Sequence, residues 1–272
     1  MNYPLGFIAG FALTALLVPG VKKFAFWIGA VDKVSTEERK IHRKPIARAG
    51  GLAIYLGFVS VSWAILGTPS RQFWGLVVAG TIVLLVGLAD DVRPLNPWVK
   101  LCFHVFAALV ASLMFGIGIE AVTNPFGEAL TLTSWQWRLV FGPASITISL
   151  VATMLAIVWL VGMTNTMNLL DGLDGLSGGV AAIAAIIMFF LSVGPKVHQP
   201  ETALISLVLA GSCLGYLIYN FYPAKIFNGD SGAYFLGMTI GILAIFSGAK
   251  LATAMLVLGL PIVDTIWAVV RR

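Results

Sequence analysis

Amides and carboxylates recur in the stretch NTMNLLDGLDGLSGG, residues 165–179, which lies between two long apolar runs. Asn168, Asp171 and Asp174 follow one another at intervals of three residues, a spacing that places them on one face of a helix. Charged side chains at the end of a membrane span are costly and usually mark a path for a substrate or an ion. The alternative is a turn that caps the next helix, because Asp and Gly are ordinary turn residues. Other polar groups must therefore decide between the two interpretations.

Two further stretches, DDVRPLNPWVK and YPAKIFNGDSG, place acidic residues at the ends of apolar runs. Asp90 and Asp91 are adjacent at the end of a predicted helix, where they oppose the helix dipole and need a compensating charge. Arg93 and Lys100 are both candidates for it. Gathered with Asp230, these like charges repel unless a cation holds them, which favours a divalent metal site. Carboxylate ligands without Cys or clustered His favour Mg²⁺, with Mn²⁺ as the alternative.

The basic segment RKIHRKPIARAGG, residues 39–51, has two interpretations. It can be a loop whose positive charge only sets membrane orientation. It can also be a phosphate clamp, in which Arg43, Lys44 and Arg48 supply charge-assisted donors and Gly50-Gly51 allow close packing at the start of the next helix.

The composition excludes an ordinary soluble domain, because 59% of the residues are hydrophobic and only 11% are charged. The net charge of +5 does not indicate a nucleic-acid partner, because most basic residues fall in loops on one side of the predicted membrane. The two cysteines are far apart within apolar runs, and the three histidines are scattered. Neither a disulfide framework nor a zinc site is supported.

Apolar runs of about 17 to 25 residues are long enough to cross the hydrocarbon core. They predict an all-α, polytopic membrane helical bundle forming a single domain over residues 1–272, without a second soluble domain. The predicted spans are 3–20, 49–67, 72–90, 99–118, 143–163, 176–194, 201–221, 232–248 and 250–268. A polar loop over 119–142 is expected to form an interfacial cap.

Basic residues set the predicted orientation. Of the 17 Lys and Arg residues, 13 fall on one side, which the positive-inside rule makes the cytoplasm. These residues are Lys22, Lys23, Lys33, Arg39, Lys40, Arg43, Lys44, Arg48, Arg93, Lys100, Lys225, Arg271 and Arg272. The N-terminus is then expected outside and the C-terminus inside, with all three acidic stretches facing the cytoplasm.

The motifs together resemble those of the polyprenyl-phosphate N-acetylhexosamine-1-phosphate transferase superfamily, glycosyltransferase family 4. The resemblance rests on Asp90-Asp91, on NTMNLLDGLDGL at residues 165–176 and on FNGD at residues 227–230, in the order and near the spacing of the family. It covers essentially the whole chain. The segment RKIHRKPIARAGG is more similar to the branch that uses UDP-N-acetylglucosamine than to the TPTMGG-type loop of the phospho-N-acetylmuramoyl-pentapeptide enzymes.

The resemblance implies an enzyme of the bacterial cytoplasmic membrane that moves a sugar-1-phosphate from a UDP-sugar to undecaprenyl phosphate and releases UMP. It implies Mg²⁺ or Mn²⁺ at Asp230, with Asp171 as a second ligand. Asp90 and Asp91 are expected to deprotonate or orient the lipid phosphate and to help hold the metal. The other implied roles are nucleotide or metal binding by Asn165, Asn168, Asp171 and Asp174, uridine binding by Asn220 and Phe227, and phosphate binding by Arg43, Lys44, Arg48 and Lys100. A homodimer is a further expectation.

Two other expectations remain. Members of this family continue past the ninth span into a His-rich loop and further membrane helix, whereas this sequence ends at Arg271-Arg272; a chain without that loop is expected to be nearly inactive. The rival class is a transporter that uses the carboxylates for ion coupling, but such a protein would place acids and broken helices near the middle of the membrane. The acids here lie at the predicted span ends.

Overall fold

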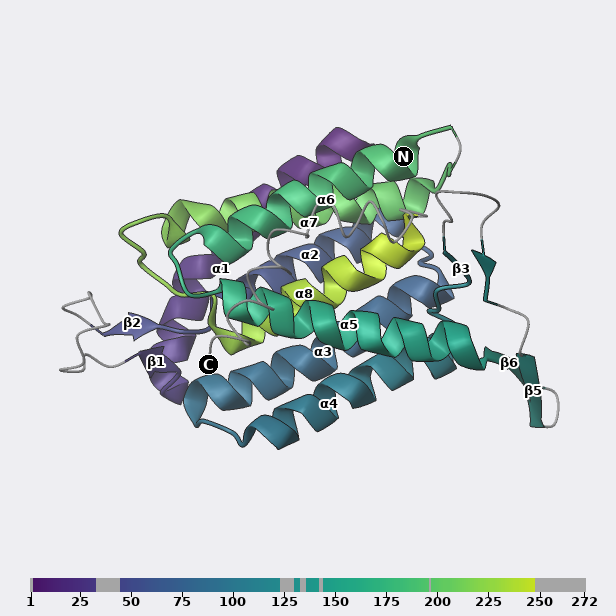
Figure 1. Ribbon diagram of the computed structural model, residues 1–272. Helices are drawn as coiled ribbons and strands as arrows, with labels where there is room; N and C mark the ends of the chain where they lie inside the picture. Colours follow the sequence, from purple (N-terminus) through teal and green to yellow (C-terminus); the bar gives the residue numbers. More distant parts are fainter. Residues whose placement is uncertain are drawn as a thin grey trace.

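The structure is a computed structural model that describes residues 2–32, 45–122, 130–132, 136–141, 144–195 and 197–247. Long helices run roughly along one direction and form a bundle, with short strands at its two ends (Figure 1). The helices are α1 (Tyr3–Ile28), α2 (Gly50–Leu66), α3 (Arg71–Val92), α4 (Pro97–Leu109), α5 (Leu150–Leu170), α6 (Leu176–Val193), α7 (Pro200–Asn220) and α8 (Gly229–Phe246), and a π-helical turn, η1 (Val110–Met114), extends α4. This confirms the predicted helical membrane bundle.

Side-chain caps start several of these helices. The Asn2 side chain accepts a hydrogen bond from Leu5 N at 3.3 Å, and the Ser70 hydroxyl accepts one from Phe73 N at 3.1 Å. Asn96 accepts from Trp98 N at 2.9 Å, just before the proline that opens α4. Such caps satisfy backbone donors that have no partner within the helix. The local sequence therefore fixes where these spans begin.

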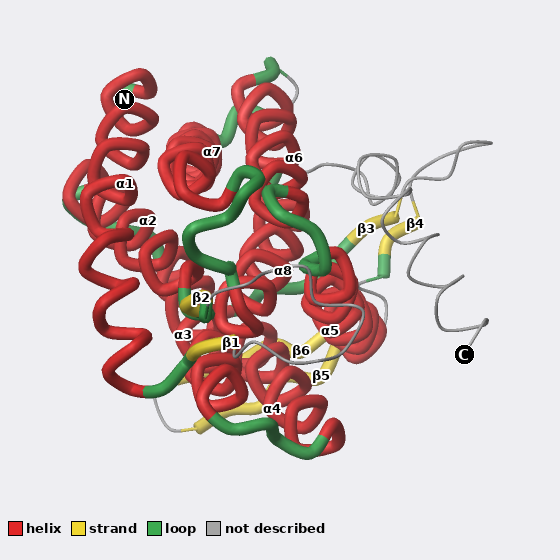
Figure 2. Tube along the Cα trace, turned by 90° about the vertical axis from the view of Figure 1, so that its left-hand side faces the viewer, coloured by secondary structure: helices red, strands yellow, loops and turns green. Residues whose placement is uncertain are grey.

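Helix α8 lies in the middle of the bundle (Figure 2). It packs against α3, α5 and α2, while α1 packs against α7 and α7 against α6. Nearly all of α8 is buried, including Tyr234 and Phe235. The first turn of α8, which carries Asp230, therefore sits at the centre of one end of the bundle.

Glycines bring the start of α8 into backbone contact with its neighbours. A Cβ atom added at Gly51 on α2 would lie 1.9 Å from the Cα of Gly232, and one added at Gly87 on α3 would lie 2.4 Å from Ser231 N. No side chain larger than hydrogen fits at these distances. The predicted close packing at Gly50-Gly51 is confirmed, and it holds the first turn of α8 between α2 and α3.

The predicted spans are correct in type and need correction at their ends. In the described part of the chain, seven helices are long and apolar enough to cross a membrane, and α2 is a shorter apolar helix. The first span continues to Ile28, eight residues beyond its predicted end. The predicted ninth span, 250–268, lies outside the described residues, and the orientation of the N-terminus stays a prediction.

The fifth span differs most from its prediction. It begins at Leu150 and ends at Leu170, because the preceding segment β6 (Ala144–Ser149) pairs antiparallel with β5 (Gln136–Phe141). The sequence ASITIS alternates apolar and polar residues and contains three consecutive β-branched ones, a pattern that suits a strand. Together with β3 (Ala121–Val122) and β4 (Leu130–Thr131), this hairpin occupies part of the predicted interfacial loop.

Candidate active site

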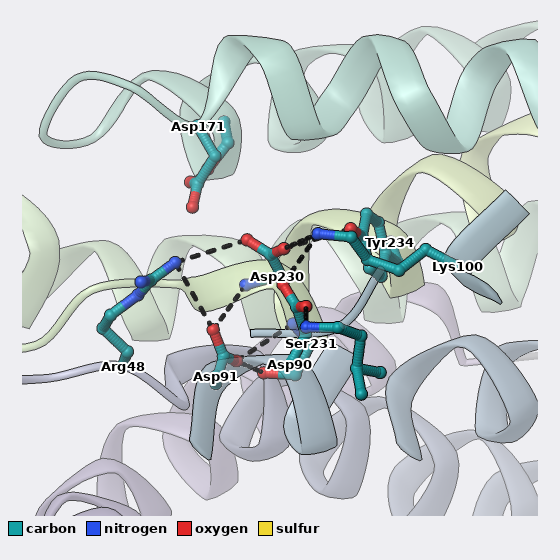
Figure 3. A network of polar contacts seen from close by, with 10 residues as sticks. Arg48, Asp90, Asp91, Lys100, Asp171, Asp230, Ser231 and Tyr234 are labelled. Carbon is teal, nitrogen blue, oxygen red and sulfur yellow. Dashed lines mark hydrogen bonds and ion pairs between the residues drawn. The ribbon is translucent and has the colours of Figure 1, made fainter. Parts of the chain in front are cut away.

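Carboxylates and basic side chains from four separate segments meet at one end of the bundle (Figure 3). The Arg48 Nη2 atom lies 3.3 Å from Asp230 Oδ1 and 3.6 Å from Asp91 Oδ1. The Lys100 Nζ atom lies 3.0 Å from Asp90 Oδ2 and 3.5 Å from Asp230 Oδ2. The predicted gathering of Asp90, Asp91 and Asp230 is therefore observed, with two cations between them.

Two cations lie among these carboxylates. From the sequence, the clustering of Asp90, Asp91 and Asp230 favours a divalent metal; in the structure, Arg48 and Lys100 also supply compensating positive charge. Opposite charges within about 4 Å favour the ionised carboxylates. The acidic cluster alone is therefore not evidence for a metal, and metal binding needs its own support.

Arg48 reaches the site because short backbone pairings fix its segment. Strands β1 (Val31–Asp32) and β2 (Ile46–Ala47) pair antiparallel, and Arg48 N donates to Ala30 O at 2.8 Å. On the other side, Phe227 N donates to Ala47 O at 2.8 Å. The arginine is thus tied to the chain immediately before α8, which carries its carboxylate partner.

Asp91 fixes the start of α8. Its Oδ1 accepts a hydrogen bond from Asp230 N at 2.8 Å, and its Oδ2 accepts from Ser231 N at 3.1 Å and from Ser231 Oγ at 2.8 Å. The carboxylate is buried and lies at the positive end of the α8 dipole, where a negative charge is favourable. The geometry gives Asp91 a positioning role, and its predicted contact with the lipid phosphate stays a prediction.

Asp90 contacts the segment that leads into α4 and the first turn of that helix. Its Oδ1 accepts from Leu95 N at 2.7 Å, and its Oδ2 contacts Lys100. The sequence left Arg93 and Lys100 open as partners of the acidic pair. Lys100, on the first turn of α4, is the partner that contacts both Asp90 and Asp230, whereas Arg93 is exposed at the C-cap of α3.

Asp171 approaches the network from the opposite side, with its carboxylate directed toward Arg48, Asp91 and Asp230 (Figure 3). It forms the C-cap of α5, and the Ser177 hydroxyl donates a hydrogen bond to its Oδ1. Burial raises the pKa of the Asp171 carboxyl to about 7, and the negative charges of Asp91 and Asp230 act in the same direction, against the Ser177 hydrogen bond. A cation placed between these carboxylates would reverse that shift.

The predicted single helical face for Asn168, Asp171 and Asp174 is only partly correct. Helix α5 ends at Leu170, so Asn168 lies on its last turn and Asp171 caps it, while Asp174 lies in the following loop. Residues 171–175 form a turn, and Gly175, at a φ of 78°, is the N-cap of α6. Asp174 Oδ2 accepts from Ala224 N at 3.0 Å, which ties this loop to the one before α8.

Two predicted substrate amides are bonded within the protein. The Asn220 side chain accepts from Gly175 N and donates to Ile226 O, both at 2.9 Å, and is only 4% exposed. The Asn165 amide donates to Val161 O at 2.8 Å and lies 3.4 Å from His104 Nδ1. These bonds give both amides positioning roles, and direct substrate contact by either stays a prediction.

Phe227 is partly buried beside Arg48, and its carbonyl accepts from Gly50 N at 2.9 Å. Its predicted stacking on uridine stays a prediction. Arg43 and Lys44 lie outside the described residues.

Three polar side chains near the carboxylates were not predicted from the sequence: Ser177, Ser231 and Tyr234. Tyr234 could have been found from helical spacing, because it follows Asp230 by four residues on α8, and Ser231 is the next residue in the chain. Ser177, six residues after Asp171, reaches it only because the chain turns between α5 and α6. That contact has no periodic signal in the sequence.

The carboxylates of Asp171 and Asp230 suit a magnesium ion whose remaining ligands come from the substrate. Among the described residues, no group of three or more His, Cys, Asp or Glu side chains forms a metal cage. Mg²⁺ is usually held by one or two carboxylates together with substrate phosphates. Asp171 and Asp230, which approach each other from α5 and α8 (Figure 3), provide such a pair of hard oxygen ligands.

Comparisons with known proteins identify the family of the chain. The chain is 34% identical over 275 residues, 98% of its length and 71% of the relative, to a probable undecaprenyl-phosphate N-acetylglucosaminyl 1-phosphate transferase of Bacillus subtilis. It is 31% identical, over 99% of its length and 71% of the relative, to a decaprenyl-phosphate N-acetylglucosaminephosphotransferase of Mycolicibacterium smegmatis. It is also 31% identical to a phospho-N-acetylmuramoyl-pentapeptide-transferase of Moorella thermoacetica, over 90% of the chain and 75% of the relative. The family model of glycosyl transferase family 4 matches residues 73–248, and the chain belongs to this family.

Proposed function

We propose that this protein transfers N-acetylglucosamine-1-phosphate from UDP-N-acetylglucosamine to undecaprenyl phosphate and releases UMP. The observation that carries the proposal is the contact of Asp230 with both Arg48 and Lys100 at one end of a membrane bundle. Alternating carboxylates and cations suit a site that must bind phosphates and a divalent ion together. The names of the relatives from Bacillus and Mycolicibacterium support this choice of donor sugar and acceptor class.

Phosphoryl transfer depends mainly on positioning and on neutralising charge at the phosphates. Arg48 and Lys100 would release their carboxylate contacts in part and donate to phosphate oxygens of the donor and the acceptor. Asp90, whose side chain is only 9% exposed, would orient the lipid phosphate next to Lys100. Phe227, beside Arg48, would stack on the uracil ring.

Asp230 and Asp171 would hold a Mg²⁺ ion, with Mn²⁺ as the alternative. When bound, the ion neutralises charge on the donor diphosphate. Its presence would also ease the repulsion that raises the pKa of Asp171, so that both carboxylates are ionised in the working site. Asp91 needs no direct contact with substrate in this scheme, because it keeps α8 and hence Asp230 in place.

The site would face the cytoplasm from the inner membrane of a bacterium, where UDP-sugars are made. The distribution of basic residues supports this orientation. The prenyl chain of the acceptor would remain in the bilayer against the helices, while its phosphate reaches the end of the bundle. Attack by the lipid phosphate on the β-phosphorus of the UDP-sugar would form a new diphosphate bond and break the bond to UMP, which leaves, so that the product is a lipid-linked sugar for an envelope polymer.

The relative from Moorella motivates a second donor, UDP-N-acetylmuramoyl-pentapeptide. Purified full-length protein should be given undecaprenyl phosphate and Mg²⁺ with each donor separately, and UMP should be measured. We expect UMP only with UDP-N-acetylglucosamine. UMP release with the pentapeptide donor alone would reject the proposed activity in favour of the second one. UMP release with neither donor would contradict both.

A further inference from the structure

The phenol of Tyr234 contacts the carboxylate that we place at the centre of the site. Its hydroxyl donates to Asp230 Oδ2 at 3.0 Å, and Tyr234 follows Asp230 by one turn of α8 (Figure 3). Lys100 Nζ lies 3.5 Å from the same oxygen, which is beyond a strong hydrogen bond. Asp230 Oδ1 instead faces Arg48. The tyrosine hydroxyl therefore lies closer to Oδ2 than the Lys100 ammonium group does.

A second buried residue fixes the tyrosine ring. The imidazole of His104 meets it edge to face, with ring centroids 4.4 Å apart and an interplanar angle of 68°. His104 is 1% exposed and Tyr234 is 2% exposed. His104 follows Lys100 by one turn of α4. One face of α4 thus supplies the ammonium group to the carboxylates and the aromatic support to the tyrosine.

Asn165 contacts the imidazole of His104. Its Nδ2 atom donates to Val161 O at 2.8 Å and lies 3.4 Å from His104 Nδ1. The other ring nitrogen, Nε2, is buried without a hydrogen-bond partner among the described residues. Packing and the contact with Asn165 therefore hold the imidazole in its place beside Tyr234.

We infer that Tyr234, supported by His104, is a positioning residue that fixes the rotation of the Asp230 carboxylate. It holds Oδ2 on the α4 side, so that Oδ1 is presented toward Arg48 and Asp171, where the ligand would bind. This inference rests on the proposed function only for its turnover measurement, since the orientation of Asp230 also controls binding of the metal alone. Groups that hold metal-binding carboxylates typically change metal affinity or activity by about 10- to 100-fold.

Tyr234→Phe removes the hydroxyl and keeps the ring. A matched control is Tyr55→Phe, which also removes a tyrosine hydroxyl from the bundle: that hydroxyl lies 2.8 Å from Thr81 Oγ1, and its ring meets Phe235 edge to face. The first measurement is the rise in melting temperature of the full-length protein, without substrates, during a titration with MgCl₂. We expect the half-saturating Mg²⁺ concentration to rise about tenfold in Tyr234→Phe and to stay within about twofold of wild type in the control.

The second measurement separates kcat from KM. Because the carboxylate is misoriented rather than lost, kcat should fall about tenfold in Tyr234→Phe at saturating Mg²⁺, while the KM for undecaprenyl phosphate stays unchanged. His104→Ala should lower kcat in the same direction. The double variant should be no worse than Tyr234→Phe alone, because His104 acts through the tyrosine. Independent, multiplicative losses would indicate two unrelated packing defects.

Equal Mg²⁺ titrations of wild type and Tyr234→Phe, including no shift in either, would overturn the inference. That result is distinguishable from failure of the proposed function. Absence of UMP release from the wild-type protein would reject the proposed reaction, while the titration with Mg²⁺ alone would still decide whether Tyr234 controls Asp230.

Discussion

The carboxylate of Asp91 accepts a 2.8 Å hydrogen bond from the backbone nitrogen of Asp230, so one acidic residue fixes the position of the other. Asp91 lies at the end of α3 and Asp230 at the start of α8. The contact makes Asp91 an N-terminal cap supplied by a neighbouring helix. Asp91, which the sequence suggests as a catalytic residue, therefore holds the start of α8 in place.

Asp91→Ala should therefore lower stability as well as activity. It removes an acceptor of three hydrogen bonds and leaves the backbone donors of Asp230 and Ser231 buried without it, and each unsatisfied buried group costs about 1–3 kcal/mol. Ser231→Ala is the matched comparison, because it removes only one of the three bonds. Thermal unfolding in detergent should rank wild type above Ser231→Ala and Ser231→Ala above Asp91→Ala. Wild-type unfolding of Asp91→Ala would refute its capping role.

Arg48→Met should reduce kcat/KM for the UDP-sugar by about 10²-fold or more, since it removes a preorganised cation from the site. Arg48→Lys should recover only part of this loss, because it keeps the charge but changes the length and shape of the side chain whose Nη2 atom contacts both Asp91 and Asp230. Arg71→Met is the control, because Arg71 donates to Met114 O elsewhere on the bundle. Steady-state kinetics of the three variants decide the matter, and equal losses in Arg48→Met and Arg71→Met would argue for a general charge effect.

Asp171→Asn should stabilise the metal-free protein at alkaline pH. The folded-state pKa of Asp171 is raised to about 7 from an ordinary value of 3.8. Its stabilising contribution is therefore complete below about pH 4 and is lost as pH rises through 7. The asparagine does not ionise and can still accept the Ser177 hydrogen bond. In EDTA, the melting temperature of the variant should exceed that of wild type at pH 8, and the difference should shrink as the pH falls and vanish below about pH 4.

Asp174→Asn provides the comparison for that measurement, because Asp174 accepts from Ala224 N in the adjacent loop. We expect no comparable gain at pH 8 from this change. A pH-independent difference between Asp171→Asn and wild type would show that the carboxyl of Asp171 is ionised as readily in the folded protein as in the unfolded chain.

The sequence could predict the helices because each apolar run is long and bounded by charges or caps, as at Ser70 and Asp91. It could also predict that Asp90, Asp91 and Asp230 meet, because the first two lie at the end of one apolar run and Asp230 lies just before another, on the same predicted side of the membrane. The fifth span was misplaced because hydropathy does not distinguish the apolar strand Ala144–Ser149 from the start of a helix.

The sequence could not show which polar residues of the site bind ligands and which hold other parts of the protein in place. Asp91 and Asn220 have the residue types of ligand-binding groups, but their side chains are bonded to backbone atoms of α8 and of neighbouring loops. Those partners are distant in the sequence and are set by helix packing. Similarly, the charge balance depends on the reach of Arg48 and Lys100 across the helix ends. Residue spacing carries no information about either relationship.

The turnover of Asp230→Asn is the decisive measurement for the proposed role of the Asp230 carboxylate. Asparagine keeps the size of the side chain and can retain the Tyr234 hydrogen bond, but it removes the charge proposed to hold Mg²⁺ and to lie between Arg48 and Lys100. The measurement is UMP release by the purified full-length protein from UDP-N-acetylglucosamine and undecaprenyl phosphate at limiting Mg²⁺, with thermal unfolding recorded in parallel. We expect an intact fold and a rate at least about 10²-fold below wild type. A folded variant with a rate near that of wild type would contradict the proposed role of Asp230.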